Sequence, residues 1–141
     1  MDTLTSLLLT IAGVFTLTLG TVHFFFPILF DFKNAISKEG PPLKPFRFWP
    51  IRYATQRSDV HGLAWVMNHA ASYGLVSIGL LDLRWSAWLH QPWATLLCLW
   101  IAGWWFLRAG SQLYLGRRRG DWLILTGFAA LGVLHIAATL I

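Results

Sequence analysis

The chain has 141 residues, of which 56% are hydrophobic and only 12% charged, and its net charge is +5. Soluble domains average about 45–50% apolar and about 25% charged residues, so this composition argues against a water-soluble domain. The basic residues flank hydrophobic runs instead of lining one polar face, which argues against nucleic acid as a partner and indicates a membrane protein. A single cysteine, Cys98, excludes an internal disulfide and any CxxC motif.

Four stretches without a charged residue divide the chain, at residues 3–30, 60–81, 85–107 and 122–141. Each reaches the roughly 20 apolar residues that cross a bilayer core of about 30 Å, and each must be helical because a lone span satisfies its backbone hydrogen bonds internally. The first run is too long and wrongly flanked for a signal peptide, so we expect it to be retained. The sequence therefore predicts one all-α integral membrane domain over residues 1–141, a four-helix bundle with helices at approximately 4–30, 59–81, 91–115 and 121–141.

The distribution of lysine and arginine predicts the orientation of these helices. Six of the eleven basic residues lie in the connection of residues 31–58, and Arg117, Arg118 and Arg119 lie in the connection before the fourth helix. Only Arg84 lies clearly in the connection between helices two and three, while Arg108 lies inside or at the edge of helix three. By the positive-inside rule both basic connections are cytoplasmic and both termini lie outside. We expect the plasma (inner) membrane of a bacterium.

The connection of residues 31–58 is unusual because it combines prolines, aromatic residues and cations. Four prolines, at positions 41, 42, 45 and 50, forbid a continuous helix. Its lipid-contacting residues are predicted to be Lys44, Phe46, Arg47, Phe48, Trp49, Arg52 and Tyr53. We expect a strap on the cytoplasmic leaflet, with rings inserted and cations on anionic headgroups. A lid over a site between the helices, or a docking surface for a partner, is the alternative.

Polar residues inside the apolar runs are the candidates for function, since burying them in a membrane is costly. The candidate ligand- or cofactor-binding residues are His23, His61, Asn68, His69 and His135. At 1.5 Å per residue, His23 lies about 12 Å inward from Asp31 and His69 about 15 Å inward from Asp59. These two and Asn68 are therefore expected at one level in the cytoplasmic half, with His61 nearer the surface and His135 towards the outer leaflet. His90 lies in the outer connection, where we expect it to be solvated.

A bland explanation competes with this pocket. The residues Gly13, Thr16, Gly20, His23 and Pro27 form one stripe on the first helix. Small residues at that spacing let helices approach closely, so the stripe indicates helix packing, with the histidines bonded across the interface.

Several chemistries fit a histidine pocket. Imidazoles could ligate haem b, hold a metal ion or pass protons. A bis-histidine haem fits poorly, because His23 and His69 lie on neighbouring helices and His135 lies about 6 Å off the level of His69. For an enzyme, His69 is the candidate acid or base and Arg108 the candidate anion clamp. The sequence contains no GxSxG, HExxH, Walker or GxGxxG motif, so an enzymatic activity stays open.

The leading hypothesis is a small polytopic membrane protein with a histidine-lined pocket near the cytoplasmic side. It would bind a small hydrophobic molecule or cofactor, alone, as a homo-oligomer or as a subunit of a larger membrane complex. The alternatives are a structural accessory subunit, an enzyme acting on a lipid or quinone-like substrate, and a small exporter. The predicted spans contain no carboxylate that would couple transport to protons, which counts against the exporter.

Overall fold

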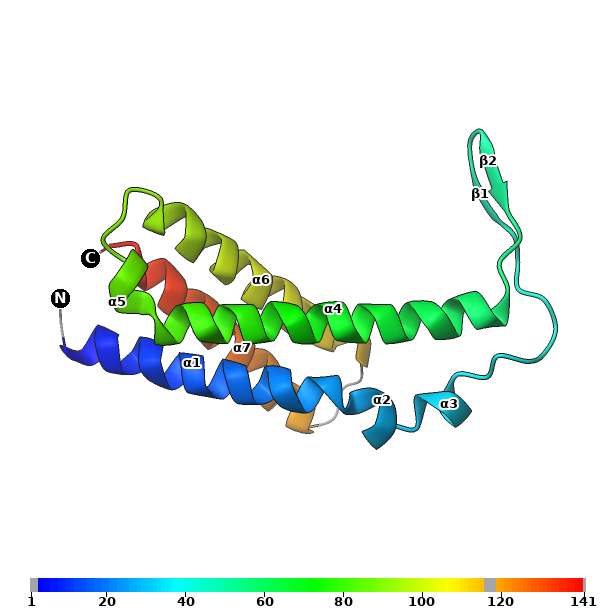
Figure 1. The fold of residues 1–141 in the computed structure, drawn as a ribbon, viewed down its shortest axis with the longest axis horizontal. Coiled ribbons are helices and arrows are strands. Elements are labelled where there is room, and N and C mark those ends of the chain that lie inside the picture. The colour runs from blue at the N-terminus through cyan, green and yellow to red at the C-terminus, as the bar shows by residue number, and fades with distance from the viewer. Residues whose placement is uncertain (1–2, 116–118, 141) are drawn as a thin grey trace. The chain divides into compact units, whose positions relative to one another are not determined.

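A computed structural model describes residues 3–115 and 119–140, with the backbone alone for Phe46, Phe48, Arg52, Tyr53 and Leu115. The fold is predominantly helical, as the sequence predicts (Figure 1). Its long helices are α1 (Thr3–Phe24), α4 (Arg57–Leu83), α6 (Ala94–Leu115) and α7 (Arg119–Ala138). Its short elements are α2 (Phe26–Leu29), α3 (Phe32–Ala35), α5 (Trp85–Trp88), β1 (Phe46–Phe48) and β2 (Ile51–Tyr53). The chain forms two compact units: unit 1 contains Met1–Phe15 and Ile78–Ile141, and unit 2 contains Thr16–Ser77.

Two helices in the described part of the chain, α1 and α7, are long and apolar enough to cross a membrane. Large apolar side chains also stand on the surfaces of the helices; Leu96, Leu107 and Leu123 are 74%, 72% and 76% exposed. Apolar side chains left exposed on helices are what a lipid environment or another protein surface would cover. Both observations are compatible with a membrane location.

The first helix ends earlier than the sequence suggests, at Phe24 instead of residue 30. Pro27 explains the end, because proline lacks an N–H and its ring clashes with the carbonyl four residues before it. The chain resumes as α2 with this proline in its first turn, where the missing donor costs nothing. Asp31 then adopts a left-handed conformation (φ 48°) and begins α3.

Helix α4 is longer at both ends than the predicted range of 59–81. At its start the carboxylate of Asp59 accepts a hydrogen bond of 2.8 Å from the backbone N–H of Gln56, which is one half of a capping box. At its end the helix continues through Leu83 and includes Asp82, which is completely buried. The sequence placed Asp82 in the following connection; the structure corrects that boundary. A charged side chain with a buried partner does not have to mark the end of a helix.

Unit 1 is built on the antiparallel pair α6 and α7, which pack along each other (Figure 1). A core cluster joins this pair to the segments before it and consists of Leu9, Trp88, Ala94, Cys98 and Ala138. Further along, the ring of Trp105 lies 5.3 Å from that of Phe128. Helix α6 begins at Ala94, three residues after the predicted start, and the predicted fourth helix extends to Ile141, outside the described residues.

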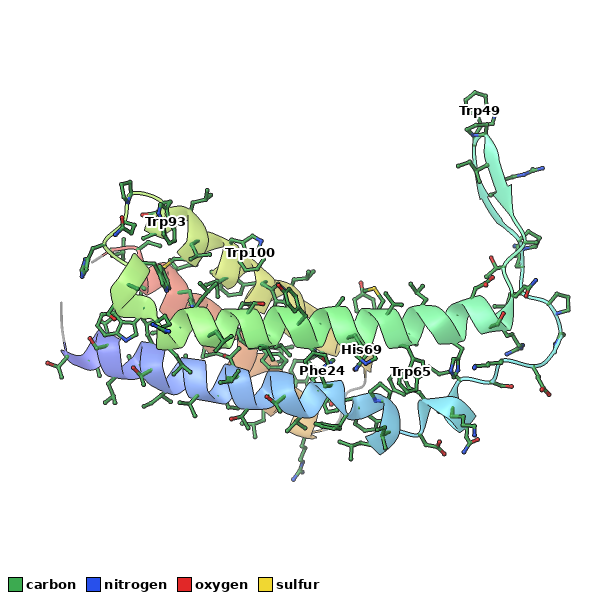
Figure 2. All side chains as sticks on the ribbon, in the orientation of Figure 1. Phe24, Trp49, Trp65, His69, Trp93 and Trp100 are labelled. Atoms are coloured by element: carbon green, nitrogen blue, oxygen red, sulfur yellow. The ribbon has the colours of Figure 1, made fainter. Side chains whose placement is uncertain are left out.

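In unit 2 the proline-rich connection contains a β-hairpin. Strands β1 and β2 are antiparallel, with Phe46 opposite Tyr53, Arg47 opposite Arg52 and Phe48 opposite Ile51. The hairpin stands away from α4, and Trp49 at its tip is 89% exposed (Figures 1 and 2). At its base the Arg57 side chain donates a 3.2 Å hydrogen bond to the carbonyl of Pro41. This bond ties the irregular segment to the first turn of α4.

Candidate functional site

A hydrogen-bonded network joins α1 to α4 inside unit 2. Nδ1 of His23 lies 3.1 Å from the hydroxyl oxygen of Ser72, and that hydroxyl donates a 2.7 Å bond to the carbonyl of Asn68. The amide of Asn68 in turn donates a 3.0 Å bond to the carbonyl of His23. The hydroxyl of Ser72 donates its only hydrogen to Asn68, so its oxygen must accept the hydrogen bond from His23. Nδ1 of His23 therefore carries a proton. The predicted proximity of His23 and Asn68 is therefore present, and Ser72 completes the network.

Glycine makes this close approach of the two helices possible. A Cβ added to Gly20 would lie 2.8 Å from the backbone nitrogen of Val76 and 2.9 Å from Cβ of Leu75. Both distances are far below the ordinary carbon contact of about 3.5–4.0 Å. The packing stripe predicted on the first helix is thus confirmed at Gly20, and His23 follows one turn later on the same face.

His69 lies next to this network but on an exposed face of α4. Its ring is 5.9 Å from the ring of Phe24 on α1 and 5.9 Å from that of Trp65, with which it is stacked (Figure 2). Nδ1 of His69 lies 2.9 Å from the carbonyl of Trp65, four residues earlier. A carbonyl only accepts, so Nδ1 holds the proton and Nε2 of the neutral ring presents a lone pair. The structure therefore places His69 in an aromatic surface with Phe24 and Trp65, separate from the His23 hydrogen bonds.

The aromatic surface continues along α4 towards its start. The ring of Trp65 also lies 6.3 Å from His61 and 6.3 Å, edge-on, from Phe32 of α3. His61 is buried, and its Nδ1 donates a 2.7 Å bond to the carbonyl of Ile36. Within the described residues the indole nitrogen of Trp65 is buried without a hydrogen-bond partner. A buried unsatisfied donor costs about 1–3 kcal/mol, so the packing of Trp65 carries a local energetic cost.

His135 lies in unit 1 and has a partner that sequence reasoning missed. Its Nε2 is 3.0 Å from Oδ1 of Asp82, and both side chains are completely buried. Its Nδ1 is 2.7 Å from the carbonyl of Leu131, so neither ring nitrogen is left for a metal or haem iron. One signal could have found the pair: Asp82 continues the buried stripe of Leu75, Ile78 and Gly79 at helical spacing.

Arg108 is half-buried within α6, and its guanidinium carbon lies 5.5 Å above the ring of Phe128 on α7. A cation over an aromatic face contributes about 0.5–2 kcal/mol. The arrangement accounts for a cation in an apolar helix by a contact within unit 1. The anion-clamp role proposed for it needs a substrate, and Arg108 stays a candidate.

The described residues contain no group of three or more histidine, cysteine, aspartate or glutamate side chains arranged to hold a metal ion. The predicted strap residues lie on the hairpin and the segment before it, but the side chains of Phe46, Phe48, Arg52 and Tyr53 are outside the described part. No protein family, characterised protein or solved structure matches the chain. The site chemistry must therefore be argued from these residues alone.

Proposed function

We propose that this is a four-span integral membrane protein of a bacterial inner membrane that binds a small hydroxylated hydrophobic molecule. The carrying observation is the aromatic surface of Phe24, Trp65 and His69, in which Nε2 of His69 has no hydrogen-bond partner among the described residues. In a soluble protein such a surface would face water. In a bilayer it faces acyl chains and the apolar molecules dissolved among them.

The four-span arrangement rests on length and charge. Helices α4 and α6 contain 27 and 22 residues, which at 1.5 Å per residue correspond to about 40 and 33 Å. Both exceed the roughly 30 Å of a bilayer core. With the basic connections on the cytoplasmic side, α1 and α6 run inward while α4 and α7 run outward, and both termini lie outside.

His69 lies at a depth that suits a ligand from the bilayer. It is twelve residues into α4, about 18 Å along the axis from Arg57. Flat rings such as Phe24 and Trp65 favour an aromatic or unsaturated ligand by offset stacking, worth about 0.5–1.5 kcal/mol per pair. Because Nε2 of His69 accepts, the preferred ligand presents an O–H donor. A quinol or another phenol with an apolar tail dissolves in the bilayer, stacks on these rings and donates its O–H to His69.

The hairpin supplies a second contact with the membrane. The register pairs Arg47 with Arg52 and Phe46 with Tyr53, so two short strands concentrate cationic and aromatic residues. That composition suits the headgroup boundary of an anionic leaflet. We propose that the hairpin rests there, with Trp49 in the interface.

The binding proposal is tested with two probes that differ only in the donor. Full-length protein in nanodiscs is titrated with 4-nonylphenol and with its O-methyl ether, and binding is corrected for partition into protein-free discs. One hydrogen bond contributes about 0.5–1.5 kcal/mol, so the phenol should bind roughly 2- to 12-fold more tightly than the ether. His69→Phe, which keeps a ring, should remove that preference.

His90→Phe is the matched control, because His90 is an exposed histidine of unit 1, remote in sequence from the aromatic surface. It should leave the preference for the phenol unchanged. Equal binding of phenol and ether to the parent protein, or a preference that survives His69→Phe, would contradict the proposed site.

A further inference from the structure

The Asp82–His135 pair of unit 1 has hydrogen-bond geometry that fixes its proton content. Nδ1 of His135 faces the carbonyl of Leu131 at 2.7 Å. A carbonyl oxygen cannot donate, so Nδ1 carries a hydrogen in every state that keeps this bond.

The contact of the other ring nitrogen, Nε2 of His135, determines how many protons the pair holds. Nε2 lies 3.0 Å from Oδ1 of Asp82, and two bare lone pairs would repel each other at that distance. One further proton must lie between them, either on Nε2 beside a carboxylate or on Oδ1 beside a neutral ring. In both cases the pair holds two protons and has no net charge, which suits its complete burial.

Among the described residues of unit 1, no other charged group pairs with Asp82 or His135 to replace that proton. Residues 3–15 of α1 contain no ionisable side chain, and α5 contains none. Helix α6 brings the buried thiol of Cys98 within electrostatic reach of Asp82. Arg108 lies ten residues further along α6, Arg84 is exposed beyond the end of α4, and Asp121 lies fourteen residues before His135 on α7. Oδ2 of Asp82 has no hydrogen-bond partner among the described residues.

A route from solvent comes close to the pair. A cavity of about 210 Å³ is lined by Leu89, His90, Gln91, Ala94, Thr95, Ala138 and Thr139. Ala138 is three residues from His135, about 4.5 Å along the axis of α7, and Ala94 is one turn from Cys98. Both alanines belong to the packed cluster that contains Cys98. Water that enters this cavity would therefore stand about one helical turn from the buried pair.

We propose that Asp82 and His135 form a proton-binding site that retains one proton at a pH where a free carboxylate and a free imidazole have both lost theirs. The ligand of this site is the proton, taken from and returned to water. The binding site for a hydroxylated molecule in unit 2 is not involved. Asp82 is a carboxylate within the long helix α4, which is the kind of residue that proton coupling requires.

The test compares the parent protein with Asp82→Asn across pH. The amide of the variant donates to Nε2 and mimics the protonated carboxyl, so its pair needs no extra proton. Unfolded aspartate and histidine lose their protons near pH 4 and pH 6.5. Above about pH 7 the folded parent therefore holds one proton more than its unfolded chain, and its stability falls as pH rises. The variant lacks this loss.

Equilibrium unfolding of the full chain in mixed micelles, from pH 7 to 9, measures the difference. The unfolding constant of the parent divided by that of Asp82→Asn should rise about tenfold per pH unit, which is the linkage of one proton. All other titrating groups occur in both proteins and cancel. A ratio that does not change with pH would overturn the proposal.

A second measurement needs no folded variant. Histidine-selective ¹⁵N NMR of the parent protein follows His135, with the exposed His90 as the internal control. His135 should keep Nδ1 protonated and Nε2 in a shared-proton state through pH 8, and the exposed His90 should show no such shared proton. A bare Nε2 on His135 at pH 8 would refute the proton site.

Discussion

The substitution Gly20→Ala tests whether the close approach of α1 and α4 holds the His23 network together. The new Cβ would lie 2.8 Å from the backbone nitrogen of Val76, 2.9 Å from Cβ of Leu75 and 3.0 Å from Cγ2 of Val76. Backbone cannot rotate away, so the helices must separate by about 0.5–1 Å to reach ordinary contact distance. Overpacking of this kind costs about 1–3 kcal/mol.

Alanine also favours a helix over glycine by about 1 kcal/mol, and a control removes that contribution. Gly103 lies inside α6 with no atom within 4 Å of an added Cβ, so Gly103→Ala carries the same propensity gain without the clash. We expect Gly20→Ala to be less stable than Gly103→Ala by about 1–3 kcal/mol in reversible unfolding in one detergent.

The same separation acts on the network one turn away. Lengthening the His23–Ser72 contact from 3.1 Å by about 0.5 Å carries it beyond hydrogen-bond range. In the Gly20→Ala background, His23→Ala should therefore cost about 1 kcal/mol less than in the parent protein. If Gly20→Ala proves as benign as Gly103→Ala, the tight helix contact, and the positioning of His23 derived from it, are refuted.

Three further outcomes follow from the same structure. The loss of stability in the double variant His23→Ala/Ser72→Ala should be smaller than the sum of the two single losses by about 0.6 kcal/mol, and by at most about 1.7 kcal/mol, the range measured for hydrogen bonds in membrane proteins. Additive losses would mean that the two side chains act separately. In a chain whose Cys98 has been replaced, cysteines introduced at Ser37 and Ser111 should not react with an impermeant thiol reagent added outside cells, whereas one at Ser86 should react. Labelling of Ser37 from outside would contradict the proposed topology. Replacing Arg47 by Gln should weaken the binding of the hairpin to anionic nanodiscs by about 1 kcal/mol, measured as a red shift of Trp49 fluorescence. Identical emission of the parent protein in neutral and anionic discs would contradict the proposed contact with anionic lipid.

The helices were predictable because their physical cause is legible in the sequence. A long uncharged run that must form all of its backbone hydrogen bonds within itself can do so only as a helix. The long described helices fall within or close to the four predicted runs. The break near Pro27 was not predicted, although the proline ring clashes with the carbonyl of His23 in a continuous helix. The hairpin was harder, because its strands have three residues each and their pairing depends on a turn at Trp49-Pro50.

The site was predictable only in part. Spacing and depth brought His23 and Asn68 to one level, and the structure adds Ser72, whose hydroxyl reads in sequence as an ordinary helix residue. Asp82 was not predicted as a site residue, because a charged residue normally marks the end of a span. Its partner His135 lies 53 residues away in the sequence. A buried pair of this kind depends on which helices meet, and one sequence does not contain that information.

The length of α4 has a consequence for the membranes in which such a protein can work. If α4 spans the bilayer, its length of roughly 40 Å exceeds the thickness of a bilayer core of about 30 Å. A helix of this length would fit within the core only if it tilted by about 40°, which is the upper limit observed for membrane helices. Without that tilt, about two turns at the Arg57 end would extend into the headgroups, together with the bond from His61 to Ile36. A bilayer thicker by about 5 Å would cover one of those turns. Hydrophobic mismatch would then act directly on the segment that carries the hairpin, and bilayer thickness becomes a variable that sets how it is presented.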